Sequence, residues 1–128
     1  MEILSDSQRA RLFSPNTFQR MKAFADQHET PFLMVDKQTI ADAYDQLVSC
    51  FPFAKIHYAV KANPATEVTE LLRDKGSNFD IASIYELEKV IKAGVDPERI
   101  SYGNTIKKAR DVRYFYEEGI FIHSPISA

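Results

Sequence analysis

Short apolar runs alternate along the chain with longer segments whose apolar residues recur every three or four positions. The first long segment begins at Ser14 and Pro15, a cap residue followed by a first-turn proline, and its apolar stripe continues to Phe24. A short apolar run follows at residues 32–35. The pattern predicts an N-terminal helix followed by a short strand.

A second helix is expected directly after this strand. Asp36 can cap it, its apolar stripe reaches Phe51, and Pro52 ends it. Cys50 lies in the last turn of this segment. We expect Cys50 to be a small buried hydrophobic residue, because free cysteines are commonly buried.

From residue 55 onward the chain repeats one unit, a short apolar strand followed at once by an amphipathic helix that a glycine ends. Strands are predicted at 55–60, 79–82, 100–103 and 120–122. Helices are predicted to begin at Asn63, Ser83 (with Glu86 as a capping box) and Asn104 or Thr105, and to end at Gly76, Gly94 and Gly119. The last helix is expected to have Ile106, Ala109, Val112 and Tyr116 on one side. The three junctions are separated by 20 and 21 residues, which suits compact βα units with parallel strands. The pattern does not distinguish an open sheet from part of a barrel.

Composition narrows the class of protein. With 128 residues, 45% hydrophobic and 27% charged, the chain resembles an ordinary globular protein of about one domain. A net charge of −2 and a pI near 5.9 give no reason to expect a nucleic acid or an anionic membrane as partner. The N-terminus lacks the features of a signal peptide, so a cytoplasmic location is expected. Cys50, the only cysteine, has no partners at metal-ligand spacing, and no metal site is expected.

One lysine is well placed for chemistry. Lys61 ends the strand predicted at 55–60, where parallel α/β folds bind their ligands. Side-chain alternation places Ala59 directly beneath it on the same face, which leaves room for a flat ring. A lysine partly buried there loses its charge more readily and can attack an aldehyde such as pyridoxal phosphate. The alternative is a solvated lysine at a strand end.

Three sequence blocks together resemble a known family. They are Tyr58–Pro64, Gly76–Ser83 followed by Glu86, and Ile100–Asn104. Their order and spacing are similar to those of the alanine-racemase-fold pyridoxal phosphate decarboxylases, in particular the bacterial ornithine and lysine decarboxylases. The resemblance runs from about Phe13 to Gly119.

The resemblance implies an α/β fold: the amino-terminal half of a (βα)8 TIM-type barrel with parallel strands, preceded by the N-terminal helix and short strand. Residues 1–36 would form that helix and strand, and residues 37–128 a partial pyridoxal phosphate-binding barrel. We expect the C-terminal β-domain of the family to be absent, and the match fades after Gly119. We therefore expect this chain to be a truncated, inactive portion of an enzyme that is a homodimer when complete, and to self-associate.

The resemblance also implies roles for individual residues. The family lysine that matches Lys61 forms the imine with pyridoxal 5'-phosphate, and Asp80 matches an acidic residue near the cofactor. Alternation turns Asp80 inward, although an aspartate there could also serve a turn or cap. Lys61, Asp80 and Ala59 are thus the predicted cofactor-binding residues, with Lys61 catalytic. His57 is expected to be a hydrogen-bonded core histidine without a catalytic role.

The implied reaction is pyridoxal phosphate-dependent decarboxylation of a small-molecule amino acid, ornithine or lysine, to a diamine in polyamine (putrescine) biosynthesis. One alternative is diaminopimelate decarboxylase, although its second block normally carries a glycine pair where this chain has Ser83–Leu87. The other is a non-catalytic relative or fragment that binds a full-length subunit.

Overall fold

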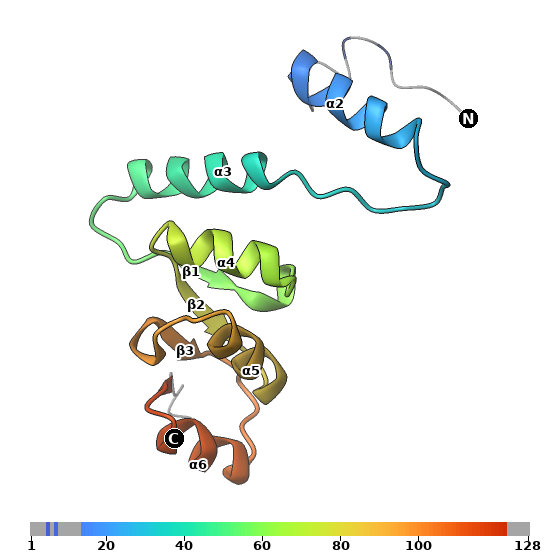
Figure 1. Cartoon of the computed structure of the whole chain (residues 1–128). Helices are drawn as coiled ribbons and strands as arrows, with labels where there is room; N and C mark the ends of the chain where they lie inside the picture. The colour runs from blue at the N-terminus through green and yellow to red at the C-terminus, as the bar shows by residue number, and fades with distance from the viewer. Residues whose placement is uncertain (1–4, 6, 8–13, 123–128) are drawn as a thin grey trace. The chain divides into compact units, whose positions relative to one another are not determined.

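The N-terminal part of the chain forms a unit of its own. The computed structural model describes Ser5, Ser7 and residues 14–122, and the chain divides into two compact units, residues 1–35 and 36–128 (Figure 1). Helix α2 (Pro15–Ala25) confirms the first predicted helix, and Ser14 Oγ accepts a hydrogen bond from the Thr17 backbone N–H at 3.1 Å.

The short strand predicted at residues 32–35 is wrong. This segment pairs with no strand in the part of the chain that the structure describes. Leu33 is 89% exposed. An apolar run without a neighbouring strand has no partner for its backbone groups, so it stays irregular.

Helix α3 (Lys37–Cys50) begins the second unit. Asp36 caps it as predicted, because Asp36 Oδ1 accepts a hydrogen bond from the Gln38 backbone N–H at 3.0 Å. Ile40 and Tyr44 pack against the core of this unit. Cys50 is exposed, so its predicted burial is wrong. The buried stripe of α3 does not extend to Cys50 in the last turn.

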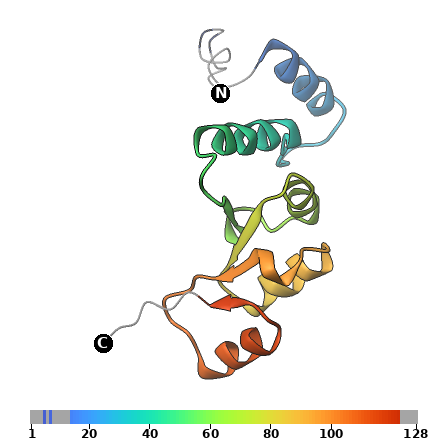
Figure 2. The same cartoon turned by 90° about the vertical axis from the view of Figure 1, so that its left-hand side faces the viewer.

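Four parallel strands form one sheet in the order β1-β2-β3-β4 (Figure 2). They are β1 (His57–Ala59), β2 (Asn78–Ile81), β3 (Ile100–Tyr102) and β4 (Phe121–Ile122). The four strands predicted from residue 55 onward, their parallel direction and the α/β class are confirmed. β1 is shorter than expected, because residues Val60–Ala62 form the 3₁₀ turn η1.

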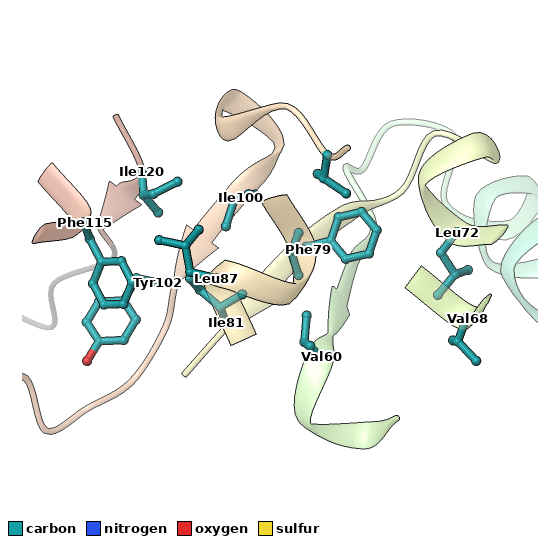
Figure 3. Packing of buried hydrophobic residues seen from close by; sticks show 12 residues of the cluster. Val60, Val68, Leu72, Phe79, Ile81, Leu87, Ile100, Tyr102, Phe115 and Ile120 are labelled. Atoms are coloured by element: carbon teal, nitrogen blue, oxygen red, sulfur yellow. The ribbon is translucent and has the colours of Figure 1, made fainter. Parts of the chain in front are cut away.

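Three helices and a second 3₁₀ turn connect these strands. They are α4 (Thr66–Asp74), α5 (Ile84–Lys92), η2 (Pro97–Arg99) and α6 (Ala109–Glu117). Figure 3 shows strand residues packing against residues of the helices. The fully buried residues from strands and helices include Val60, Phe79, Ile81, Ile100, Tyr102, Leu87, Val90 and Phe115. Every second strand residue therefore packs against the helices, which leaves the opposite face of the sheet for a site.

Two helices begin later than the sequence predicts. α4 begins at Thr66 and α6 at Ala109. In each case the predicted asparagine cap instead forms a tight turn: Asn63 Oδ1 accepts from the backbone N–H of Ala65 at 3.1 Å, and Asn104 Oδ1 from that of Ile106 at 3.3 Å. Asparagine makes this local bond readily, so a loop precedes each helix.

The late start of α6 also changes its buried face. Ile106 precedes the helix and is 81% exposed, Tyr116 is 78% exposed, and Phe115 is fully buried. The predicted helix side of Ile106, Ala109, Val112 and Tyr116 does not form as a whole, because Ile106 lies outside the helix. Phe115 instead packs on the ring of Tyr102, with ring centroids 4.1 Å apart.

Arg99 connects the end of α4 to the start of β3. Its Nε donates to the Ser77 carbonyl at 3.1 Å and its Nη2 donates to the Arg73 carbonyl at 2.9 Å. Ser77 is fully buried, so its carbonyl has little access to water. A cation at a helix C-terminus also interacts favourably with the helix dipole.

Replacing Arg99 with methionine should lower the free energy of unfolding by about 2 kcal/mol, because two carbonyls lose a charged donor. Urea unfolding followed by circular dichroism measures the change. Arg110→Met is the matched control: the Arg110 side chain is 78% exposed and pairs with the neighbouring Asp111, so we expect a change within about 0.5 kcal/mol. Equal effects of the two substitutions would contradict the assigned role of Arg99.

Candidate active site

The face of the sheet that lies away from the helices carries polar residues. Ala59 lies opposite Asp80 in the register of β1 and β2, and Asp80 lies opposite Ser101 in the register of β2 and β3. On either side of Asp80, Phe79 and Ile81 are fully buried in the core. Alternation therefore places Asp80 on the opposite face from the core, as predicted.

Lys61 lies one residue beyond the fully buried Val60, in the turn η1. Because β1 ends at Ala59, strand alternation does not fix the direction of the Lys61 side chain. Lys61 is exposed, so its predicted partial burial is wrong for the described part of the chain. Within those residues its amine forms no hydrogen bond or ion pair. The amine is therefore accessible to a carbonyl compound.

A hydrogen bond between the residues that flank it holds the turn that carries Lys61. The hydroxyl of Tyr58, which precedes the turn, donates to the carbonyl of Asn63, which follows it, at 3.1 Å. The Tyr58 ring packs edge-on against Phe79, with ring centroids 6.3 Å apart. Burial raises the pKa of Tyr58, so its hydroxyl stays protonated and remains a donor.

Tyr58→Phe should loosen this turn. Loss of the hydrogen bond is expected to cost about 1 kcal/mol of stability and to speed amide hydrogen exchange in residues 60–63. Hydrogen exchange read by mass spectrometry or NMR tests this. Tyr85→Phe removes the same hydroxyl from a residue that is 79% exposed and should change neither quantity. Unchanged protection of residues 60–63 in Tyr58→Phe would refute the role of the hydroxyl.

The Asp80 side chain lies against β3. Ser101 Oγ lies 3.4 Å from Asp80 Oδ1, and a Cβ built on Gly103 would lie only 2.4 Å from the same oxygen. The Asp80 carboxylate accepts no backbone N–H within the described residues, so the alternative of a turn or helix cap does not apply.

His57 makes a hydrogen bond, as expected, but it is not a core residue. Its Nδ1 lies 3.2 Å from Ser101 Oγ, while the residue as a whole is exposed. Sequence reasoning overlooked Ser101. A serine inside an apolar strand belongs to no motif, and only its inward position opposite Asp80 could have indicated a role.

Comparison with known proteins decides the family. Residues 37–124 match the model of "Pyridoxal-dependent decarboxylase, pyridoxal binding domain". The chain belongs to this family. A lysine/ornithine decarboxylase from Selenomonas ruminantium is 37% identical over 93 residues, which cover 73% of this chain and 24% of that protein. An antizyme inhibitor 2 from Xenopus laevis is 34% identical over 89 residues, which cover 70% and 20%.

Solved structures agree with this assignment. The lysine/ornithine decarboxylase from Vibrio vulnificus, complexed with putrescine, matches with a TM-score of 0.76 and 29% identity over 84% of this chain and 30% of that one. Other matching structures include an arginine decarboxylase and a diaminopimelate decarboxylase. The family thus contains decarboxylases of several basic amino acids.

These matches locate the chain within the family fold. The structural neighbours are TIM-barrel decarboxylases, and this chain corresponds to the N-terminal part of their barrel. It spans about a quarter of the length of the curated relatives it matches. The cofactor of the family is pyridoxal phosphate. Within the described residues, none of the helices has the length and apolar character that a membrane span requires.

Proposed function

We propose that this chain supplies the cofactor lysine of a pyridoxal phosphate-dependent decarboxylase that acts on ornithine or lysine and forms a diamine for polyamine biosynthesis. The observation that carries the proposal is the position of Lys61. Lys61 is exposed, follows the last residue of β1, Ala59, by two positions, and lies within the segment that matches the family; Ala59 in turn lies opposite Asp80. Catalytic groups of barrel enzymes occupy this end of the strands.

The residues present fit the cofactor. One accessible primary amine, Lys61, can bond to an aldehyde carbon, and one carboxylate, Asp80, is held nearby on the next strand. Ala59 lies opposite Asp80 and two residues before Lys61, and its small side chain leaves room for a ring. When bound, pyridoxal phosphate withdraws electrons from the substrate α-carbon, which allows carbon dioxide to leave.

The chain's own residues have distinct tasks in this proposal. Lys61 holds the cofactor through its Nζ, and the turn fixed by Tyr58 sets the place from which that amine reaches the site. Asp80 supplies a fixed negative charge that favours cationic groups near it. Residues 37–128 would form part of the cofactor-binding barrel and residues 1–36 a separate N-terminal segment. The complete enzyme would act as a cytoplasmic homodimer.

Two other functions are compatible with the same family. Diaminopimelate decarboxylase has the same fold among the solved neighbours, but the segment Ser83–Leu87 lacks the glycine pair of that group's second block. A non-catalytic binding role is favoured by one relative, which is named an antizyme inhibitor. In that case this chain would act by binding a full-length subunit.

A chimeric enzyme tests the proposed function. Residues 37–122 of this chain replace the matching segment of the Selenomonas lysine/ornithine decarboxylase, to which the chain is 37% identical. We expect the chimera to release carbon dioxide from lysine and ornithine. Lys61→Ala in the chimera should lower kcat by at least about 10³-fold, because it removes the covalent attachment.

Lys55→Ala is the matched control, since Lys55 is also exposed and lies six residues earlier. This variant should keep most of the activity. A folded chimera whose activity survives Lys61→Ala would disprove the proposed function. Tight binding of the unmodified chain to a full-length subunit, together with an inactive folded chimera, would favour the non-catalytic role.

A further inference from the structure

Ser101 is the centre of a polar cluster on the inner face of the sheet. Its Oγ lies 3.2 Å from His57 Nδ1, 3.3 Å from the Phe79 carbonyl and 3.4 Å from Asp80 Oδ1. Ser101 itself is 3% exposed. A hydroxyl donates one hydrogen bond and accepts up to two. A bond donated by His57 therefore leaves the Ser101 proton for the Phe79 carbonyl or the Asp80 carboxylate.

Gly103 provides the space into which Asp80 turns. A Cβ at Gly103 would lie 2.4 Å from Asp80 Oδ1 and 3.0 Å from Oδ2. The carboxylate thus occupies the volume that any larger residue would fill. Gly103 is not among the glycines with positive φ, so the close approach of Asp80, and not the backbone conformation, accounts for a glycine here.

Lys61 is a cation that follows the residue opposite Asp80. It follows Ala59 by two residues, and Ala59 lies opposite Asp80. Strand spacing and residue rise place the Cα atoms of Lys61 and Asp80 roughly 6–8 Å apart, a separation that their side chains can span. Within the described residues, however, the two form no ion pair.

We propose that Ser101 and Gly103 are positioning residues that hold Asp80 on β3 and so keep the amine of Lys61 unpaired. The inference rests on the proposed function of Lys61 as the cofactor lysine. A carboxylate within about 4–6 Å favours the ammonium form of a lysine, and an ammonium has no lone pair with which to attack a carbonyl. In this arrangement Asp80 stays on β3 within the site and does not pair with Lys61.

The reactivity of Lys61 toward a small aldehyde tests this proposal in the 128-residue chain. Brief treatment with formaldehyde and cyanoborohydride at neutral pH, followed by peptide mapping, gives a methylation rate for each lysine. In Ser101→Ala the rate at Lys61 should fall about tenfold, the effect of one nearby opposite charge. Gly103→Ala should lower it in the same direction. The rate at the exposed Lys89 serves as internal reference and should not change.

Two further variants distinguish the positioning of Asp80 from a general loosening of the structure. Ser77 is as deeply buried as Ser101 but bonds to the Asn78 carbonyl at 2.7 Å, so Ser77→Ala should leave the Lys61 rate unchanged. Ser101→Ala combined with Asp80→Asn should restore the rate, because the competing charge is gone. An unchanged rate in both Ser101→Ala and Gly103→Ala, or a loss that persists with Asp80→Asn, would overturn the proposal. Formaldehyde needs no cofactor site, so this result is independent of whether Lys61 binds pyridoxal phosphate.

Discussion

The 128-residue polypeptide by itself, supplied with pyridoxal phosphate, is expected to release carbon dioxide from ornithine or lysine at least about 10⁴-fold more slowly than the chimeric enzyme. Barrel enzymes take catalytic and cofactor contacts from the ends of many strands, and this polypeptide contains about a quarter of its relatives' length. Each lost charge-stabilising contact typically costs about 10²–10³ in rate. Radiometric release of labelled carbon dioxide measures the difference.

The polypeptide with Lys61→Ala is the control for background chemistry. Free pyridoxal phosphate and any accessible amine give a slow reaction, so the two polypeptides should differ by less than about tenfold. A rate close to that of ordinary decarboxylases, about 1–10³ s⁻¹, would show that the described strands already build a complete site. That result would contradict the half-barrel account.

The second large effect is self-association of the same polypeptide. The described sheet has two open edges, β1 and β4, whose unpaired backbone groups can pair with another copy. Residues 120–122 are Ile, Phe and Ile without a charge, which makes the β4 edge prone to such pairing. We expect dimers or larger species at micromolar concentration, increasing with concentration.

Multi-angle light scattering across a concentration series tests this expectation. Ile122→Lys places a charge at the β4 edge and should reduce association. Ile106→Lys adds the same charge at an apolar residue that is 81% exposed and lies outside the sheet, so it should have little effect. A compact monomer at high concentration, with cooperative unfolding, would show that the edges of β1 and β4 are not open to another copy.

Most of the fold follows from local chemistry. Each of the three helix-ending glycines predicted from sequence has a positive φ, 88° at Gly76, 80° at Gly94 and 73° at Gly119, a conformation that favours glycine. One half of the predicted capping box forms: Ser83 Oγ accepts from the Glu86 backbone N–H at 3.3 Å. The Glu86 carboxylate, however, accepts from the N–H of Ala82 at 2.8 Å and not from that of the cap residue Ser83.

The wrong predictions fall where two local interactions compete for one residue, or where a neighbouring element decides whether a segment forms a strand. Asn104 could cap a helix or form a turn, and spacing alone cannot rank the two. It forms the turn, and its side-chain amide also donates to the carbonyl of Ala82, the residue after β2, at 3.2 Å. The strand predicted at residues 32–35 needed a neighbour that the sequence does not reveal.

The site was predictable in its positions and unpredictable in its contacts. Alternation placed Asp80 on the inner face, and the end of the strand placed Lys61 in the turn after β1. The seat formed by Ser101 and Gly103 depends on the register between β2 and β3, which the sequence does not specify. Exposure of Lys61 was missed because burial depends on elements that lie far from it in the chain.

The most direct test of the central claim is to trap the lysine that binds the cofactor. The chimeric enzyme is loaded with pyridoxal phosphate, reduced with borohydride and digested, and the labelled peptide is sequenced by mass spectrometry. We predict a stable label on Lys61 at close to one per subunit. Label on Lys55 or Lys75, with Lys61 unmodified, would contradict the assignment of Lys61 as the cofactor lysine.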